Sequence, residues 1–129
     1  MPTILDYLGL PIPGHVHGDS LRPYIEGRED LDRPAFSERS NNDANWVARS
    51  IRTREWRYNF AYLPEKGNSG RYVRCRPYEL FNLIDDPGEE RNLAEETKYR
   101  DIIKKLDDQL RQHLVDTDDP WVDKLPALT

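Results

Sequence analysis

The stretch Trp56-Arg57-Tyr58-Asn59-Phe60-Ala61-Tyr62-Leu63 decides the fold, because aromatic residues occupy every second position of it. Successive side chains of a β-strand point to opposite faces, so this alternation predicts a strand with one aromatic face. Residues 46–53 are rich in Trp, Val and Ile and predict a second strand. Only Thr53-Arg54-Glu55 separates the two strands, which favours a hairpin although the usual Asn-Gly turn is missing.

Two further segments complete the expected sheet. Residues 35–38 form a short candidate strand, and residues 78–84 carry apolar side chains on both faces. Because strands that are covered on both faces have this pattern, we expect residues 78–84 to lie centrally in the sheet. Residues 64–70 are rich in Gly, Pro and polar residues and predict an exposed loop. The sequence therefore predicts about four antiparallel strands within residues 35–84.

Residues 97–115 predict one long amphipathic helix. Its apolar residues recur at helical spacing on one face, at Tyr99, Ile102, Ile103, Leu106, Leu110 and Leu114. Charged residues are expected on the opposite face, at Lys104, Lys105, Asp107, Asp108 and Arg111. One helix covers one face of a sheet, so the fold class is α+β. The other sheet face needs a partner if Phe60 and Tyr62 point towards it.

The ends of the chain have weaker patterns. Pro2 suits the first turn of a short helix, and Gly9 suits the left-handed position that ends it. Residues 11–34 predict a long loop with one helical turn at 21–26, and loops beyond ~15 residues are usually functional or pinned to a partner. Residues 85–88, Asp-Asp-Pro-Gly, predict a turn, and Trp121 is expected to pack on a surface. We therefore expect a single subdomain over residues 1–129, made of a helix and wrapping loop (1–34), a sheet (35–84) and a turn, helix and tail (85–129).

Charge is distributed unevenly over the 129 residues. The net charge of −5 divides into −4 for residues 1–48, +6 for residues 49–76 and −7 for residues 77–129. Such a basic segment either recognises an anionic ligand or solvates the outer strand faces and pairs with the acidic C-terminal third. The acidic balance and the sequence pI of about 5.2 argue against nucleic acid as a partner.

Neither a membrane segment nor a disulfide is expected in this sequence. No apolar run approaches the ~20 residues of a membrane helix. The first residues also lack the basic start and apolar stretch of a signal peptide, and these patterns name no compartment. The one cysteine, Cys75, has no partner for an internal disulfide, and we expect it to lead into the strand at residues 78–84.

No set of residues has the pattern of a complete catalytic site. His15 and His17 have a spacing that can bind a metal, but a zinc site needs further ligands, and Asp19 is the only local candidate. No serine lies in a G-x-S-x-G context, and no phosphate-binding glycine loop is present. We therefore expect no catalytic residue and no metal ligand in this chain.

Six segments resemble the sulfatase family of the alkaline phosphatase superfamily, in the group of arylsulfatases and heparan-type sulfatases. Each is weakly specific alone, but together they follow the family order along nearly the whole chain. The segments are Pro2–Gly9 (PTILDYLG), Gly18–Gly27 (GDSLRPYIEG), Phe36–Glu38 (FSE), Ser50–Tyr58 (SIRTREWRY), Glu79–Ala94 (ELFNLIDDPGEERNLA) and Thr117–Trp121 (TDDPW).

The resemblance implies a C-terminal subdomain that docks on a large α/β catalytic domain. In that family the nucleophile is a formylglycine made from the Cys of a C-x-P-S/A-x-R motif, and Asp and Asn residues bind a divalent cation; both lie upstream of the region that this chain resembles. The nearest local string is Cys75-Arg76-Pro77-Tyr78-Glu79, in which Glu79 replaces the required Arg. We therefore reject Cys75 as the nucleophile and expect the chain alone to be inactive.

The leading hypothesis is that the chain completes the fold and the pocket rim of a sulfuric ester hydrolase. Specificity residues often lie on loops that border a pocket, so the pocket-rim candidates for substrate contact are His15, His17, Asn41, Asn42 and Trp46. The expected partners are a sulfatase catalytic domain, in the same or a separate chain, and a sulfated substrate, with a homo-oligomer through an exposed sheet face as a further option. The alternative is a stand-alone anion-binding or protein-interaction module that uses the Arg-rich residues 49–76.

Overall fold

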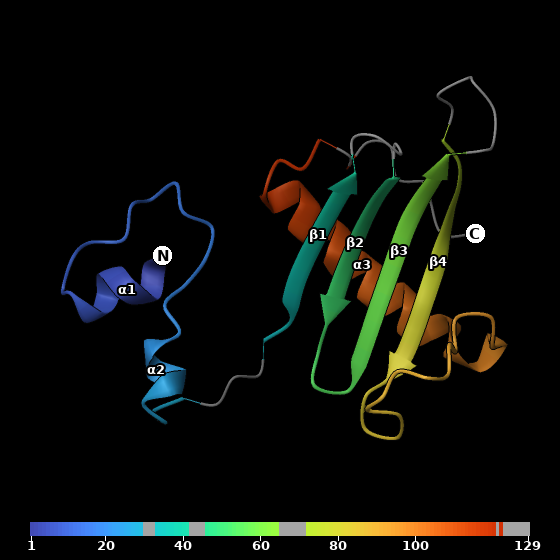
Figure 1. Ribbon diagram of the computed structural model, residues 1–129, viewed down its shortest axis with the longest axis horizontal. Coiled ribbons are helices and arrows are strands. Elements are labelled where there is room, and N and C mark those ends of the chain that lie inside the picture. The colour runs from blue at the N-terminus through green and yellow to red at the C-terminus, as the bar shows by residue number, and fades with distance from the viewer. Residues whose placement is uncertain (30–32, 42–45, 65–71, 121, 123–129) are drawn as a thin grey trace. The chain divides into compact units, whose positions relative to one another are not determined.

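The computed structural model describes residues 1–29, 33–41, 46–64, 72–120 and 122 (Figure 1). The chain divides into two compact units, Met1–Arg33 and Pro34–Thr129, which are termed the N-terminal unit and the sheet unit. Two expectations lie outside the described residues, namely most of the loop at residues 64–70 and the packing of Trp121. Among the residues described, no helix is both long and apolar enough to cross a bilayer.

The N-terminal unit contains two short helices, as the sequence predicts. Helix α1 spans Pro2–Tyr7 and helix α2 spans Arg22–Ile25. Gly9 ends α1 with a φ of 66°. Its N–H donates to the Asp6 carbonyl at 3.0 Å, and the Leu10 N–H donates to the Leu5 carbonyl at 2.9 Å. This is the Schellman arrangement of a helix C-terminus, which favours glycine because its backbone lies in the left-handed region.

The sheet unit contains four antiparallel strands in the order β1-β2-β3-β4 (Figure 1). The strands span Ala35–Asn41, Trp46–Arg52, Trp56–Pro64 and Tyr72–Asn82. Strand β1 therefore extends three residues beyond Glu38, where the sequence predicted its end. The expected hairpin between β2 and β3 is confirmed, since the Thr53 N–H donates to the Trp56 carbonyl at 2.8 Å. Each strand pairs with the next along the chain, so the sheet is a meander.

The alternation of β3 is confirmed and separates the two faces of the sheet. The strand register aligns one row of apolar residues that face α3, consisting of Phe36, Ile51, Tyr58 and Leu80. The neighbouring row is polar and lies on the opposite face, and it consists of Ser37, Ser50, Asn59 and Glu79. Phe60 belongs to the apolar core, so it does not leave an aromatic patch on the outer face; the side chain of Tyr62 is outside the described part.

The expected central position of residues 78–84 is wrong, because β4 forms an edge of the sheet. The strand also begins earlier, at Tyr72, and ends at Asn82. Its free edge is covered by the chain that follows: the Leu93 N–H donates to the Leu80 carbonyl at 2.8 Å, and the Leu80 N–H donates to Asn92 Oδ1 at 3.1 Å. Leu80 and Phe81 are both buried, although they lie on opposite faces. A pattern of apolar residues on both faces therefore indicates that a strand is buried, and it does not indicate whether the strand is central or at an edge of the sheet.

Helix α3 spans Arg100–Asp116 after a 3₁₀ turn at Thr97–Tyr99 and covers one face of the sheet (Figure 1). The predicted apolar stripe is confirmed. Its most buried members are Ile103, Leu106, Leu110 and Leu114, with Tyr99 and Ile102 partly buried beside them. Together with Val47, Ile51, Tyr58, Phe60, Leu80 and Leu93, these residues form the core of the sheet unit.

One helix residue is not where the sequence places it. Asp107 was expected on the charged face but is only 2% exposed. Its position falls between Ile103 and Leu110 on the face that packs on the sheet. The Tyr58 hydroxyl donates to Asp107 Oδ1 at 3.0 Å, and Arg111 forms an ion pair with the same carboxylate. These partners compensate for the cost of burying a charge, which the apolar pattern alone does not reveal.

Candidate functional site

The candidate pocket-rim residues belong to two different parts of the chain. Asn41 ends β1 and Trp46 begins β2, and the register pairs them with each other. Asn42 lies outside the described residues, as do the side-chain positions of Asn41 and Trp46. Their backbones therefore form the base of the β1–β2 hairpin tip.

His15 and His17 lie in the N-terminal unit, between α1 and α2, and both are exposed. Within the described parts of the chain, no group of three or more His, Cys, Asp and Glu side chains could hold a metal ion. The divalent cation that the resemblance implies is therefore given no such group of ligands by the described residues.

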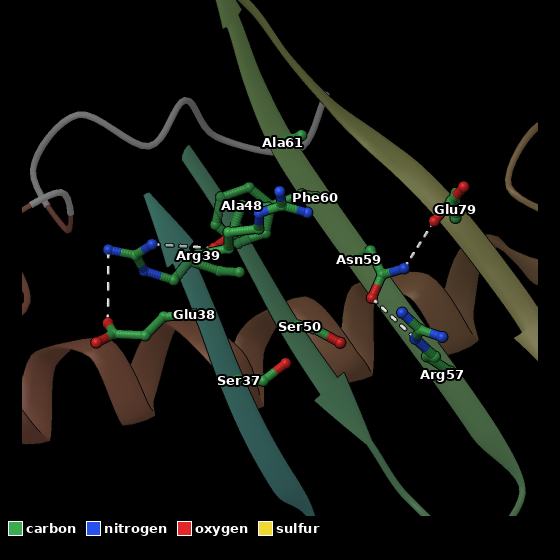
Figure 2. Close-up of a pocket in the computed structure, with 11 residues that line it drawn as sticks. Ser37, Glu38, Arg39, Ala48, Ser50, Arg57, Asn59, Phe60, Ala61 and Glu79 are labelled. Atoms are coloured by element: carbon green, nitrogen blue, oxygen red, sulfur yellow. Dashed lines mark hydrogen bonds and ion pairs between the residues drawn. The ribbon is translucent and has the colours of Figure 1, made fainter. Parts of the chain in front are cut away.

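The outer face of the sheet carries a depression of about 310 Å³ (Figure 2). Its floor includes the polar row formed by Ser37, Ser50, Asn59 and Glu79. Asn59 lies between two charged neighbours in Figure 2: its Nδ2 donates to Glu79 at 2.7 Å, and its Oδ1 accepts a bond from Arg57 Nε at 3.3 Å. Asn59 as a whole is 7% exposed. This arrangement makes a polar, internally bonded surface.

Two arginines of the basic segment share one carboxylate. Glu89 accepts hydrogen bonds from Arg52 Nη1 at 2.9 Å and from Arg57 Nη1. Glu89 has a φ of 56°, in the left-handed region that residues other than glycine seldom adopt. The two ion pairs hold this turn residue against strands β2 and β3. The single negative charge of Glu89 is therefore shared by the two guanidinium groups.

A third arginine, in the middle of β2, is buried with its partner. Arg49 on β2 pairs with Asp119, with Nε and Nη2 at 2.9 and 2.8 Å from Oδ2. Their side chains are 3% and 4% exposed. Arg49 Nη1 also donates to the Ala48 carbonyl at 2.9 Å, and Nη2 lies 3.7 Å from Glu38. Asp119 belongs to the segment Thr117–Trp121, so this ion pair fixes the chain after α3 to the sheet.

The turn before α3 is held by two side chains that accept backbone hydrogen bonds. Asp86 accepts from the N–H groups of Glu90 and Arg91 at 3.0 and 2.9 Å. These backbone donors, led by Arg91, lower the pKa of Asp86 below the ordinary aspartate value. Asn92 Oδ1 accepts from the N–H groups of Leu80 and Ala94 at 3.1 and 3.0 Å. Both side chains satisfy backbone donors and fix the chain direction before α3.

The comparison with known families agrees with the segments quoted above. A family model described as N-sulphoglucosamine sulphohydrolase, C-terminal, matches residues 1–116. The chain belongs to this family. The four-stranded sheet covered by a C-terminal helix, which the resemblance to sulfatases implied, is confirmed by the structure.

Individual relatives of this sulphohydrolase C-terminal domain are also sulfatases. Arylsulfatase K of Danio rerio is 36% identical over 115 residues, which is 85% of this chain and 20% of that protein. The human N-sulphoglucosamine sulphohydrolase is 27% identical over 163 residues, covering 94% of this chain and 32% of that protein. A crystal structure of a candidate sulfatase from Bacteroides thetaiotaomicron aligns with a TM-score of 0.75 and 25% identity, over 95% of this chain and 25% of that one. The chain thus spans between a fifth and a third of the length of these relatives.

Sequence reasoning missed the partners of the arginines but not their charge balance. The contrast between +6 in residues 49–76 and −7 in residues 77–129 indicated pairing, and Arg49, Arg52 and Arg57 do pair with Asp119 and Glu89. No local pattern singles out Asp119 or Glu89, since each lies more than 30 residues from its arginine.

Proposed function

We propose that the chain is the C-terminal subdomain of a sulfatase-type sulfuric ester hydrolase and completes the fold and substrate-pocket rim of that enzyme. The match of the C-terminal family model to residues 1–116 carries this proposal. The whole of residues 1–129 acts as one subdomain, with a helix and wrapping loop at 1–34, a sheet at 35–84 and a turn, helix and tail at 85–129. Its partner is a sulfatase catalytic domain, in the same or a separate chain.

The internal contacts support a structural role for the family segments. Asp86 and Asn92 are occupied by backbone donors, and Asp119 is occupied by Arg49. These contacts give the three side chains structural partners within the chain. The formylglycine and the divalent cation of the proposed enzyme are proposed to belong to the catalytic domain, and the chain alone is proposed to be inactive.

The rim of the pocket is proposed to include the β1–β2 hairpin tip and the loop between α1 and α2. The residue types Asn, Asn and Trp at positions 41, 42 and 46 supply amide groups and an indole, which suit the hydroxyl groups and the ring face of a sugar. His15 and His17 are exposed and offer imidazoles. The substrate is proposed to be a sulfated molecule, consistent with relatives named as sulfatases and a sulphohydrolase.

The anion-binding alternative is not favoured by the contacts of the basic segment. Arg49, Arg52 and Arg57 each form an ion pair with a carboxylate of the same chain. Two carboxylates, Asp119 and Glu89, supply these pairs, and they are buried and half-buried, respectively. Among the described side chains of the segment, these three arginines are thus engaged in pairing within the chain.

A chimera tests the proposal. The chain replaces the matching part of human N-sulphoglucosamine sulphohydrolase, and sulfate release from N-sulphoglucosamine is measured for the chimera and for the 129-residue chain. We expect turnover by the chimera and only background by the chain. A well-folded chimera that releases no sulfate contradicts the proposal.

The rim residues are tested in the same chimera. Asn41→Ala and Trp46→Ala should raise KM several-fold and change kcat less, because a rim residue holds the substrate without touching the reacting atoms. Ile84→Ser, an exposed substitution in the turn after β4, is the matched control and should leave both constants unchanged. Equal kinetics for all three variants would remove the hairpin tip from the pocket rim.

A further inference from the structure

The depression on the outer face of the sheet is hollowed where short side chains lie between longer ones (Figure 2). The register aligns Ser37 with Ser50 and Ala48 with Ala61, in two neighbouring rows of this face. These side chains end at Cβ or one atom beyond it, so a ligand can approach the strands closely there. Longer side chains, among them Arg57, line the depression beside them. Its volume of about 310 Å³ falls within the range of small-molecule sites.

The polar groups of the depression retain hydrogen-bonding capacity. Neither the Ser37 nor the Ser50 hydroxyl is engaged in a hydrogen bond with the part of the chain that the structure describes. The Asn59 amide uses one N–H for Glu79 and one acceptor position for Arg57, so one donor and one acceptor position remain. The same two bonds hold the amide in one orientation before a ligand arrives, which lowers the entropy cost of binding.

These groups form one row across the four strands. The register places Ser37, Ser50, Asn59 and Glu79 opposite one another on successive strands. Neighbouring strands lie ~4.8 Å apart, so the row presents one polar side chain at about that interval. Hydroxyl and amide groups can each donate and accept, and the carboxylate at the end of the row accepts. A ligand that matches the row therefore carries several closely spaced groups that both donate and accept hydrogen bonds.

The charges around the depression match in number and favour an uncharged ligand. Among the described residues, the charged side chains that line it and those joined to them by ion pairs comprise four arginines and four carboxylates, namely Arg39, Arg49, Arg52 and Arg57 with Glu38, Glu79, Glu89 and Asp119. A ligand of either charge would meet like charges as well as opposite ones. Like charges held close together cost free energy, so a neutral ligand fits the depression best.

We propose that the outer-face depression binds a neutral sugar ring, a pyranose whose hydroxyl groups bond to Ser37, Ser50 and Asn59. Each sugar hydroxyl both donates and accepts, so it suits the serine hydroxyls and the two remaining positions of the amide. Glu79 orients Asn59 and accepts a hydrogen bond from a further hydroxyl of the ring. The site goes beyond the proposed function, because it needs no group of the catalytic domain and no sulfate on the ligand.

Nuclear magnetic resonance of the nitrogen-15-labelled 129-residue chain tests the site by titration with glucose, galactose and mannose. We expect the side-chain amide resonances of Asn59 to shift and saturate for at least one of these sugars. The expected dissociation constant is on the order of 1 mM, as for other ligands of about a dozen non-hydrogen atoms.

Three variants locate the binding. Ser50→Val removes a hydroxyl and adds bulk to the depression, so it should weaken binding at least about tenfold. Glu79→Gln keeps the shape of the side chain and should weaken binding about threefold to tenfold, because a hydrogen bond to a charged acceptor is roughly twice as strong as one to a neutral acceptor. Gln109→Val, at an exposed position of α3, is the matched control and should leave the dissociation constant unchanged.

Several outcomes would overturn the sugar site. One is an Asn59 amide that does not shift at sugar concentrations about fifty times the expected dissociation constant. Another is equal affinity of the Ser50→Val, Glu79→Gln and Gln109→Val chains. Tighter binding of sodium sulfate than of any of the three sugars at the same amide would overturn the choice of a neutral ligand. Sugar binding by the chain that is lost in the chimera would show that the rest of the enzyme covers this face, which also overturns the site. Sulfate release by the chimera is a separate measurement, and its absence would contradict the proposed function alone.

Discussion

The contacts within the N-terminal unit differ in kind from the contacts within the sheet unit. In the N-terminal unit, Asp6, Ser20 and Arg22 make the contacts between the helices, and large apolar side chains such as Leu8 remain exposed. In the sheet unit, the apolar side chains are buried between the sheet and α3, while ion pairs fix its turns and tail. The comparison teaches that one unit has a core of its own, whereas the other presents the apolar surface that a core would need.

The largest expected effect concerns the buried ion pair of the sheet unit. Asp119→Ala should lower the free energy of unfolding by about 3–5 kcal/mol, because it leaves the buried guanidinium of Arg49 without its partner. Urea unfolding followed by circular dichroism measures the change. The double variant R49M/D119L removes both charges and should recover most of the loss. If the single variant costs no more than the double one, the tail is not fixed by this pair.

The next effect compares the same substitution in the two units. Leu110→Ala should lower the free energy of unfolding by about 2–5 kcal/mol, because it opens a cavity in the core. Leu8→Ala should change it by no more than about 0.5 kcal/mol in the 129-residue chain, because its side chain is already exposed. Urea unfolding of both variants checks the contrast. Similar losses for the two would show that the N-terminal unit shares the core.

A smaller effect is expected at the turn that covers the edge of β4. Asn92→Ala removes the acceptor of the Leu80 and Ala94 N–H groups and should cost about 1–2 kcal/mol. Hydrogen–deuterium exchange should show the Leu80 amide exchanging faster in the variant, while the amides in the middle of α3 keep their rates relative to global unfolding. An unchanged exchange rate of the Leu80 amide would contradict the role of Asn92 in covering the edge of β4.

The smallest effect is a dependence on pH at Asp86. Its pKa in the folded chain is lowered by the backbone N–H groups of Arg91 and Glu90. The stability that its ionised form contributes is complete above the unfolded-state pKa and is lost as the pH falls through the folded pKa. The difference in unfolding free energy between wild type and Asp86→Asn should therefore shrink below about pH 4. Urea unfolding between pH 7 and pH 3 checks this, and a difference that grows on acidification would reverse the assignment.

The sequence predicted the elements of the fold because their periodicities are local. The alternation from Trp56 to Leu63 and the stripe from Tyr99 to Leu114 each follow from one element packing on another. The edge position of β4 was missed because its free edge is covered by a later part of the chain, through the bond from the Leu93 N–H to Leu80. The burial of Asp107 was missed because its partner, the Tyr58 hydroxyl, is distant in sequence. The ion pair of Arg49 and Asp119, 70 residues apart, was missed for the same reason.

The candidate site was predicted to a smaller extent. Register pairs Asn41, at the end of β1, with Trp46, at the start of β2. Their role in binding stays a prediction, as does that of His15 and His17, because a pocket rim is defined by the surface opposite it. Sequence patterns describe how a chain packs on itself, and a substrate pocket shared with a catalytic domain depends on residues of that domain.

Sulfate release by the purified 129-residue chain tests the central claim most directly. With a divalent cation and an aryl sulfate, we predict a rate no higher than that of the uncatalysed reaction, in a chain that circular dichroism shows to be folded. Saturable, cation-dependent release of sulfate by the chain alone would contradict the account, because it would place a complete catalytic site within these residues.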